Sequence, residues 1–145
     1  MLATSVAAPY SRAHNLTLAG LALAQTVVFL VPMIVLGQAI GWPGSLRLPP
    51  ADVFGLIRAA PLSVTVGYGA YLLVSLALIP LAVAMRAYMA REGAGGVLAD
   101  IAMALGVVAG VLKMLGIVRW LVAMPALAAL HADGDPATRA MAEVA

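Results

Sequence analysis

The sequence predicts an all-α transmembrane helical bundle, and three observations lead to this prediction. Hydrophobic residues make up 64% of the 145 residues and charged residues only 10%, whereas soluble domains average about 50% and about 25%. The mean hydropathy is high, at +1.07. Apolar runs cover residues 16–40, 62–85 and 96–122, and each is long enough to cross a hydrocarbon core of about 30 Å as a helix. We therefore expect a single membrane domain with three spans.

The first span ends in a turn of Gly41, Trp42, Pro43 and Gly44. Trp42 lies where an aromatic ring would anchor the chain at the membrane boundary. In the connection that follows, we expect Asp52 to cap a short interfacial helix over residues 53–60. Its apolar side chains, Val53, Phe54, Leu56 and Ile57, are expected on the bilayer surface, with Arg58 facing water.

The second span carries a mildly polar stripe. At 100° per residue, Tyr68, Tyr71 and Ser75 fall within about 60° of one another, and we expect this stripe to face protein. Pro80 should bend the helix in its last third. The short polar linker over residues 91–96 predicts that the second and third spans are antiparallel neighbours.

The third span carries a strip of small residues, Ala102, Gly106 and Gly110, at every fourth position. Such a strip lets another backbone approach closely, so we expect helix packing with another membrane subunit or by self-association. Lys113 lies on the same strip. Two interpretations of Lys113 stay open. Its ammonium pairs with oxygens of Tyr68, Tyr71, Gln25 or a partner, or it extends along the helix toward the headgroups.

Arg119 and Trp120 predict the interfacial end of the third span, with a helical overhang to residue 130 that leaves the bilayer or packs on a partner. Asp135 and Pro136 then form a strong helix start, as N-cap and first helical residue. Few residues follow, which leaves two interpretations: the chain ends there, or it is the N-terminal part of a longer protein.

The run from Gly116 to Leu127, GIVRWLVAMPAL, precedes an acidic turn and a helix rich in Ala and Glu. This pattern, with the span and Arg-ended loop before it, resembles a bacterial family of multi-span membrane proteins classified only as a domain of unknown function. The resemblance covers about residues 62–145. It implies further spans beyond residue 145 and a bacterial inner-membrane location, and it brings no activity, substrate or catalytic residue.

Motifs for chemistry are absent from the sequence. It has no cysteine, no phosphate-binding glycine loop, no dinucleotide fingerprint and no zinc-binding histidine pair. The eight Lys and Arg residues are scattered singly, which argues against nucleic acid as a partner. We therefore predict no enzyme activity, no catalytic residue, no cofactor and no metal site.

Two functions remain. The first is a structural or interaction subunit, that is, an accessory subunit of a larger membrane assembly with the lipid bilayer as its surroundings. The second is a transporter or channel component with a polar path near Lys113, Tyr68 and Tyr71. We expect a cell-membrane protein with a cytoplasmic N-terminus, because Arg12, Arg86 and Arg91 then lie inside and only Arg47 and Arg58 lie in the first outside loop. The margin is thin, since Arg119 and Arg139 at the end of the third span would also lie outside.

Overall fold

The computed structural model describes residues 12–145, which form helices and turns with no strand among them. This confirms the all-α fold class. The elements in chain order are α1 (Arg12–Ile40), η1 (Gly44–Arg47), α2 (Pro50–Ala59), α3 (Pro61–Arg91), α4 (Val97–Val118), η2 (Arg119–Ala123), α5 (Met124–Asp133) and α6 (Pro136–Val144).

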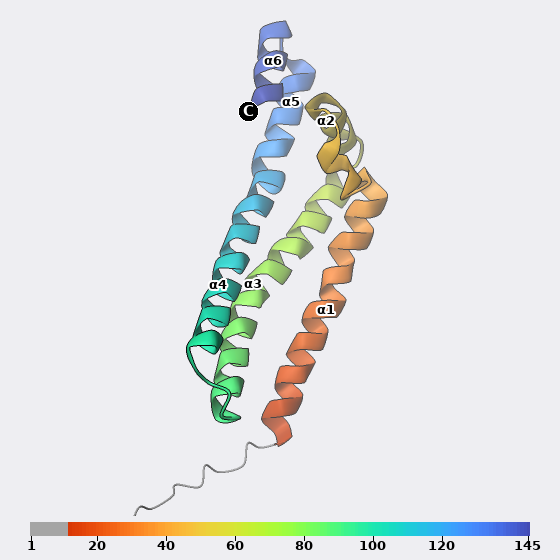
Figure 1. Ribbon diagram of the computed structural model, residues 1–145. Helices are drawn as coiled ribbons and strands as arrows, with labels where there is room; N and C mark the ends of the chain where they lie inside the picture. Colours follow the sequence, from red (N-terminus) through yellow and green to blue (C-terminus); the bar gives the residue numbers. More distant parts are fainter. Residues whose placement is uncertain (1–11) are drawn as a thin grey trace, which may run out of the picture.

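Three helical stretches are long and apolar enough to span a membrane: Asn15–Ile40, Pro61–Arg91 and Val97–Asp133. The chain is thus a membrane protein with an α-helical membrane domain. The second stretch stays helical through Pro80 and continues to Arg91, six residues beyond its expected end. The third includes α4, η2 and α5 in one continuous helical run (Figure 1).

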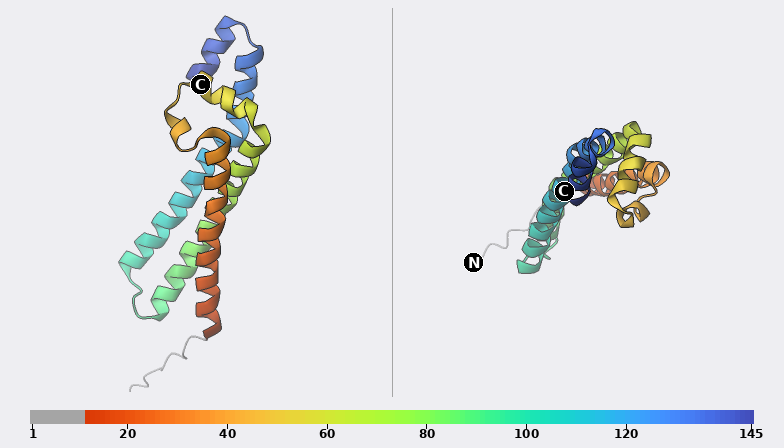
Figure 2. Two further views of the ribbon diagram at one scale, coloured as in Figure 1. Left: turned by 90° about the vertical axis from the view of Figure 1, so that its right-hand side faces the viewer. Right: turned by 90° about the horizontal axis from the view of Figure 1, so that it is seen from above.

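The three long helices form a layer in which α3 lies between α1 and α4 (Figures 1 and 2). α3 packs along both neighbours, whereas α1 and α4 have hardly any backbone contact with each other. One polar bond ties α1 to α3, because Gln25 Nε2 donates to the carbonyl oxygen of Val74 at 2.6 Å. The outer faces are apolar and exposed, as expected of helices surrounded by lipid.

The strip of small residues packs against α3 of the same chain, so these glycines are not free for a partner. A Cβ atom at Gly106 would lie 2.8 Å from Cβ of Ala82, and one at Gly110 would lie 2.9 Å from Cγ1 of Ile79. Ala102 is exposed within this chain and does not pack on α3, so its role in packing against another chain stays a prediction. Ala102 is eight positions from Gly110, which is about 80° around a helix of 3.6 residues per turn, so one straight contact line cannot hold both.

Ala99, Gly110 and Ile117 are the buried residues of α4. They are 11 and 7 residues apart, so at 100° per residue all three lie on nearly the same face of α4. This face packs on α3.

The π-helical turn η2 lies directly before Pro125. Here the Met124 N–H donates to the carbonyl oxygen of Arg119, five residues back. Because proline lacks an N–H and its ring clashes with the carbonyl four residues earlier, a wider turn is one way to keep the helix continuous. The sequence analysis treats residues 96–130 as one helical run despite Pro125, and the structure keeps that run continuous through this wider turn.

α2, α5 and α6 pack together at one end of the spans (Figure 1). Val53, Phe54 and Ile57 of α2 are buried in a cluster that includes Met124 and Ala128 of α5. The expectation that the apolar face of α2 lies on the bilayer surface is therefore wrong, because the overhang of the third span covers that face. We call this unit of α2, α5 and α6 the helical cap.

Two helix starts in the cap contrast with each other. α2 begins at Pro50 and has no side-chain cap, so Asp52 lies in the first turn and is not the N-cap that the sequence predicted. α6 begins as predicted: Asp135 is its N-cap, and Oδ1 accepts the Thr138 N–H at 2.8 Å. This hydrogen bond lowers the pKa of the Asp135 carboxyl.

Candidate functional site

Lys113 reaches across the layer of helices from α4. Its Nζ lies 5.0 Å from the ring centroid of Tyr71 on α3 and 5.4 Å from that of Phe29 on α1. Both distances are within the cation–π range. Lys113 makes no hydrogen bond or ion pair with any residue from 15 to 145. Within this chain the ammonium therefore lies against ring faces and does not pair with an oxygen of Tyr68, Tyr71 or Gln25. Pairing with a partner and extension toward the headgroups stay predictions.

Aromatic rings continue from this point toward the helical cap. The Tyr71 ring meets the Trp42 ring edge-on at 6.1 Å, and Tyr68 stacks on Trp120 of η2 with centroids 4.9 Å apart and an interplanar angle of 16°. Phe29 meets Tyr71 edge-on at 5.6 Å. These contacts join α1, α3 and the end of α4 through aromatic side chains.

An open pocket of about 200 Å³ lies among these rings. We call it the lysine pocket. It brings together the predicted residues Lys113, Tyr68, Tyr71, Trp42 and Trp120, with Gly116 at its edge. Ser75 does not line it, because its hydroxyl faces its own helix and donates to the Tyr71 carbonyl oxygen at 2.8 Å.

The Tyr68 hydroxyl is a second polar group without an acceptor at this site. Tyr68 is 2% exposed, and its oxygen is buried with no hydrogen-bond partner among the described residues. Such groups are rare in folded proteins. The lysine pocket therefore holds an ammonium and a phenol, two hydrogen-bond donors, without a protein acceptor for either.

On the side of Lys113 away from the cap, α4 packs closely on α3. A Cβ atom added at Gly110 would lie 3.2 Å from the Ser75 carbonyl oxygen, and Gly106 packs on Ala82 one turn further down. The next charged side chains are Arg86 and Asp100, which form an ion pair at the far end of the spans. Between that pair and Arg119, Lys113 is the only charged residue of the described spans.

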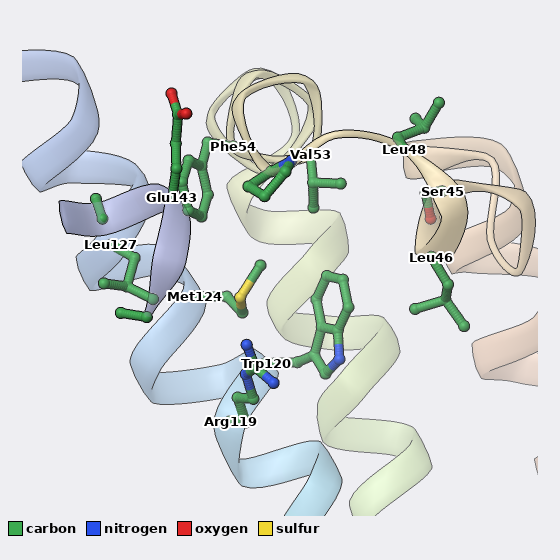
Figure 3. Close-up of a pocket in the computed structure, with 13 residues that line it drawn as sticks. Ser45, Leu46, Leu48, Val53, Phe54, Arg119, Trp120, Met124, Leu127 and Glu143 are labelled. Atoms are coloured by element: carbon green, nitrogen blue, oxygen red, sulfur yellow. The ribbon is translucent and has the colours of Figure 1, made fainter. Parts of the chain in front are cut away.

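A second pocket, of about 310 Å³, lies between the spans and the helical cap (Figure 3). We call it the cap pocket. Arg119, Trp120 and Met124 line one side, and Val53 and Phe54 of α2 line another (Figure 3). Trp120 also lines the lysine pocket, so its indole forms part of the wall between the two.

The interfacial position of Arg119 and Trp120 stays a prediction. At 1.5 Å per residue, the rise along α4 from Asp100 to Arg119 is about 28 Å, close to a hydrocarbon core of about 30 Å. This rise is compatible with Arg119 and Trp120 at one boundary of the core and the Arg86–Asp100 ion pair at the other.

Sequence reasoning missed Phe29, whose ring faces Lys113. A signal existed, since Phe29 is the only Phe, Tyr or Trp in residues 12–40. Lone aromatic residues are common in spans, however, and the register between α1 and α4 decides which residue it meets.

Comparisons with protein-family models, curated proteins and solved structures found no match for this chain. The resemblance to a bacterial membrane family stays a prediction. Residues 15–145 contain no group of three or more His, Asp or Glu side chains placed to hold a metal ion.

Proposed function

We propose that this chain is a structural or interaction subunit of a larger membrane assembly and has no catalytic role. One observation carries the proposal: Lys113 lines an open pocket in the spans, and no described residue accepts a hydrogen bond from its ammonium. A partner helix with a carboxylate or amide side chain at this depth would satisfy this group.

The energetics favour an acceptor from another chain. A lysine near the centre of a span costs about 2.5–3.5 kcal/mol on insertion scales. A cation–π contact returns about 0.5–2 kcal/mol. Contacts with Phe29 and Tyr71 offset much of the cost, and they leave the Tyr68 hydroxyl without a partner. A charge-assisted hydrogen bond from Lys113 to a partner adds about 1.5–3 kcal/mol.

The arrangement of helices leaves room for such a partner. α1 and α4 hardly contact each other, and the lysine pocket opens beside Gly116 of α4, where a Cβ atom would meet nothing within 4 Å. A helix seated there would lie against α1, α3 and α4 together. The helical layer would then become a closed bundle, which is the usual packing of membrane helices.

A transporter or channel component is the second candidate, favoured by the meeting of Lys113, Tyr68 and Tyr71 at one open pocket. It has less support, because the packing of Gly110 and Gly106 against α3 stops the polar groups about one turn below Lys113. A path across the membrane would need polar residues from further chains or segments.

For location we propose the inner membrane of a bacterium, with the N-terminus and the Glu92 loop in the cytoplasm. Arg86 and Arg91 support this orientation. The opposite end carries more arginines, at positions 47, 58, 119 and 139, so the reverse orientation is the alternative that labelling must exclude.

Site-specific crosslinking tests the proposal. A small diazirine-bearing amino acid at Gly116 faces the lysine pocket, and the same probe at Val118, which is 45% exposed and about 200° further around α4, serves as the matched control. We expect crosslinks to a second polypeptide from position 116 only. Lys113→Met should reduce their yield while the isolated chain keeps its helix content.

Identification of the crosslinked chain separates the two functions. A different membrane protein supports the subunit, whereas a second copy of this chain, with water-accessible Lys113, supports the transporter component. Crosslinks to lipid alone at both positions, in cells at native expression, would contradict the proposal.

A further inference from the structure

The cap pocket lies at the depth of lipid headgroups. Arg119 and Trp120 stand at the boundary of the hydrocarbon core by the rise along α4, and residues of α2 and α6 line the pocket together with them (Figures 1 and 3). Its volume of about 310 Å³ is at the lower end of the range of small-molecule sites, about 300–1,000 Å³. A ligand there would meet both headgroup and acyl-chain surroundings.

Arg119 is the only basic side chain that lines the cap pocket, and it forms no ion pair with any described residue. Figure 3 shows its guanidinium rising from η2 toward Met124, beside the Trp120 indole. A guanidinium binds phosphate through paired hydrogen bonds, which a compact ammonium does not match. The pocket therefore offers one unpaired cation suited to a phosphate oxygen.

Glu143 is the only acidic side chain among the lining residues, and it is already engaged. Its Oε1 lies 2.9 Å from Nε2 of His131 on α5. Figure 3 shows the carboxylate directed away from Arg119. A ligand that carries its own cationic group would find no free acidic side chain among the lining residues, so the charges of these side chains favour a headgroup with a net negative charge.

The remaining walls suit the glycerol part of a lipid. Phe54, Met124 and Leu127 form an apolar surface beside Arg119. Ser45 also lines the pocket; it is 2% exposed, and its hydroxyl is buried without a partner among the described residues.

From these features we infer that the cap pocket binds the phosphate of an anionic phospholipid, held by Arg119, with the glycerol backbone against Phe54, Met124 and Leu127. The site is distinct from the lysine pocket, and the inference does not depend on the proposed function. It assigns the cap a role in fixing a membrane lipid at the end of the spans.

Lipid titration of the purified full chain, followed by native mass spectrometry, tests the inference. The probes are phosphatidylglycerol, phosphatidylcholine and inorganic phosphate, each added to delipidated protein in neutral detergent. We expect one phosphatidylglycerol to be retained, at least about tenfold more tightly than phosphatidylcholine, because phosphatidylglycerol carries a net negative charge beside Arg119 and phosphatidylcholine carries none. Millimolar phosphate should not displace the lipid.

Substitutions locate the site. Arg119→Gln should weaken phosphatidylglycerol binding about tenfold or more, through the loss of charge-assisted hydrogen bonds. Arg58→Gln is the matched control, because Arg58 is exposed at the same end of the molecule and does not line the pocket. Arg119→Lys keeps the positive charge but lacks the planar guanidinium fork that donates paired hydrogen bonds, so it should give an intermediate affinity. Lys113→Met should leave lipid binding unchanged, which separates this site from the lysine pocket.

Several outcomes would overturn the inference. Equal retention of phosphatidylcholine would remove the charge argument, and displacement by inorganic phosphate would make this a free phosphate site. Equal losses in Arg119→Gln and Arg58→Gln would indicate general surface charge. Helix content and thermal melting verify the fold of each variant. If Arg119→Gln fails to fold, full wild-type affinity in Arg119→Lys would still contradict recognition by the guanidinium fork.

Discussion

Replacing Gly110 with alanine probes the tight contact between α3 and α4. The new Cβ atom would lie 2.9 Å from Cγ1 of Ile79 and 3.2 Å from the carbonyl oxygen of Ser75. The Ile79 side chain can rotate, but the Ser75 carbonyl is part of the α3 backbone and cannot. The helices must therefore move apart. Gly116, six residues later on α4, provides the matched control, because a Cβ atom added there would have nothing within 4 Å.

The comparison isolates the contact energy. Alanine has a higher helix propensity than glycine by about 0.8–1.0 kcal/mol, and this gain applies to both positions and cancels in the difference. Overpacking of a close contact costs about 1–3 kcal/mol. Gly110→Ala should therefore be less stable than Gly116→Ala by about 1–3 kcal/mol. Leucine enlarges the effect, so Gly110→Leu should lose far more stability than Val111→Leu, whose site is 40% exposed.

Unfolding of the purified variants by SDS in mixed micelles, followed by circular dichroism, gives the free energy of unfolding of Gly110→Ala and of Gly116→Ala. Equal stability of Gly110→Ala and Gly116→Ala would show that α3 and α4 separate at no cost. The small residues would then have no packing role.

Three further predictions concern the ends of the spans and the cap. Cysteines at Glu92 and Asp133, labelled by an impermeant reagent in intact cells, should react from opposite sides of the membrane; labelling from the same side would exclude three crossings. Phe54, which is 2% exposed, packs α2 on α5, so Phe54→Ala should cost about 3–5 kcal/mol of unfolding free energy in the SDS assay, and a loss below about 1 kcal/mol would contradict this packing. The lowered pKa of Asp135 means that its ionised form stabilises α6 at neutral pH and that this contribution is lost as the pH falls below about 4. The Thr138 amide NMR signal should titrate with a midpoint below the ordinary Asp value and lose this titration in Asp135→Asn.

The spans were predictable because the bilayer permits few alternatives. Backbone groups in hydrocarbon must be satisfied internally, so a long apolar run can only be a helix. The same reasoning could not place α2. Its apolar face of Val53, Phe54 and Ile57 has the same pattern whether it meets lipid or α5, because periodicity shows which side is apolar and not what covers it. α5 covers the apolar face of α2 because the third span continues as a helix through Pro125 and carries α5 over α2.

The candidate site was predictable along single helices and not between them. The positions of Tyr68, Tyr71 and Lys113 around α3 and α4 follow from 100° per residue, and all three line one pocket. Phe29 and Trp120 join that site through the register of neighbouring helices, which depends on the tertiary contacts of the whole layer. Ser75 lies on the predicted face of α3 yet outside the pocket, because its hydroxyl finds an acceptor in its own helix.

Lys113 and Arg119 are cations on one continuous helix, separated by a rise of about 9 Å, and their surroundings give them opposite energetic roles. Arg119 is exposed, and at its predicted headgroup level water and phosphate can solvate it, so its charge costs little and its removal should affect ligand binding more than stability. Lys113 lies inside the span against Phe29 and Tyr71, with ring faces in place of oxygens. Lys113→Met should therefore leave the isolated chain equally stable or more stable, because an apolar side chain of similar length suits this position better. If Lys113→Met raises the stability of the isolated chain and lowers the yield of the crosslinked complex, then the charge of Lys113 is satisfied only in the assembly. A Lys113→Met variant that is destabilised alone, with full crosslinking at Gly116, would instead assign Lys113 to the packing of this chain.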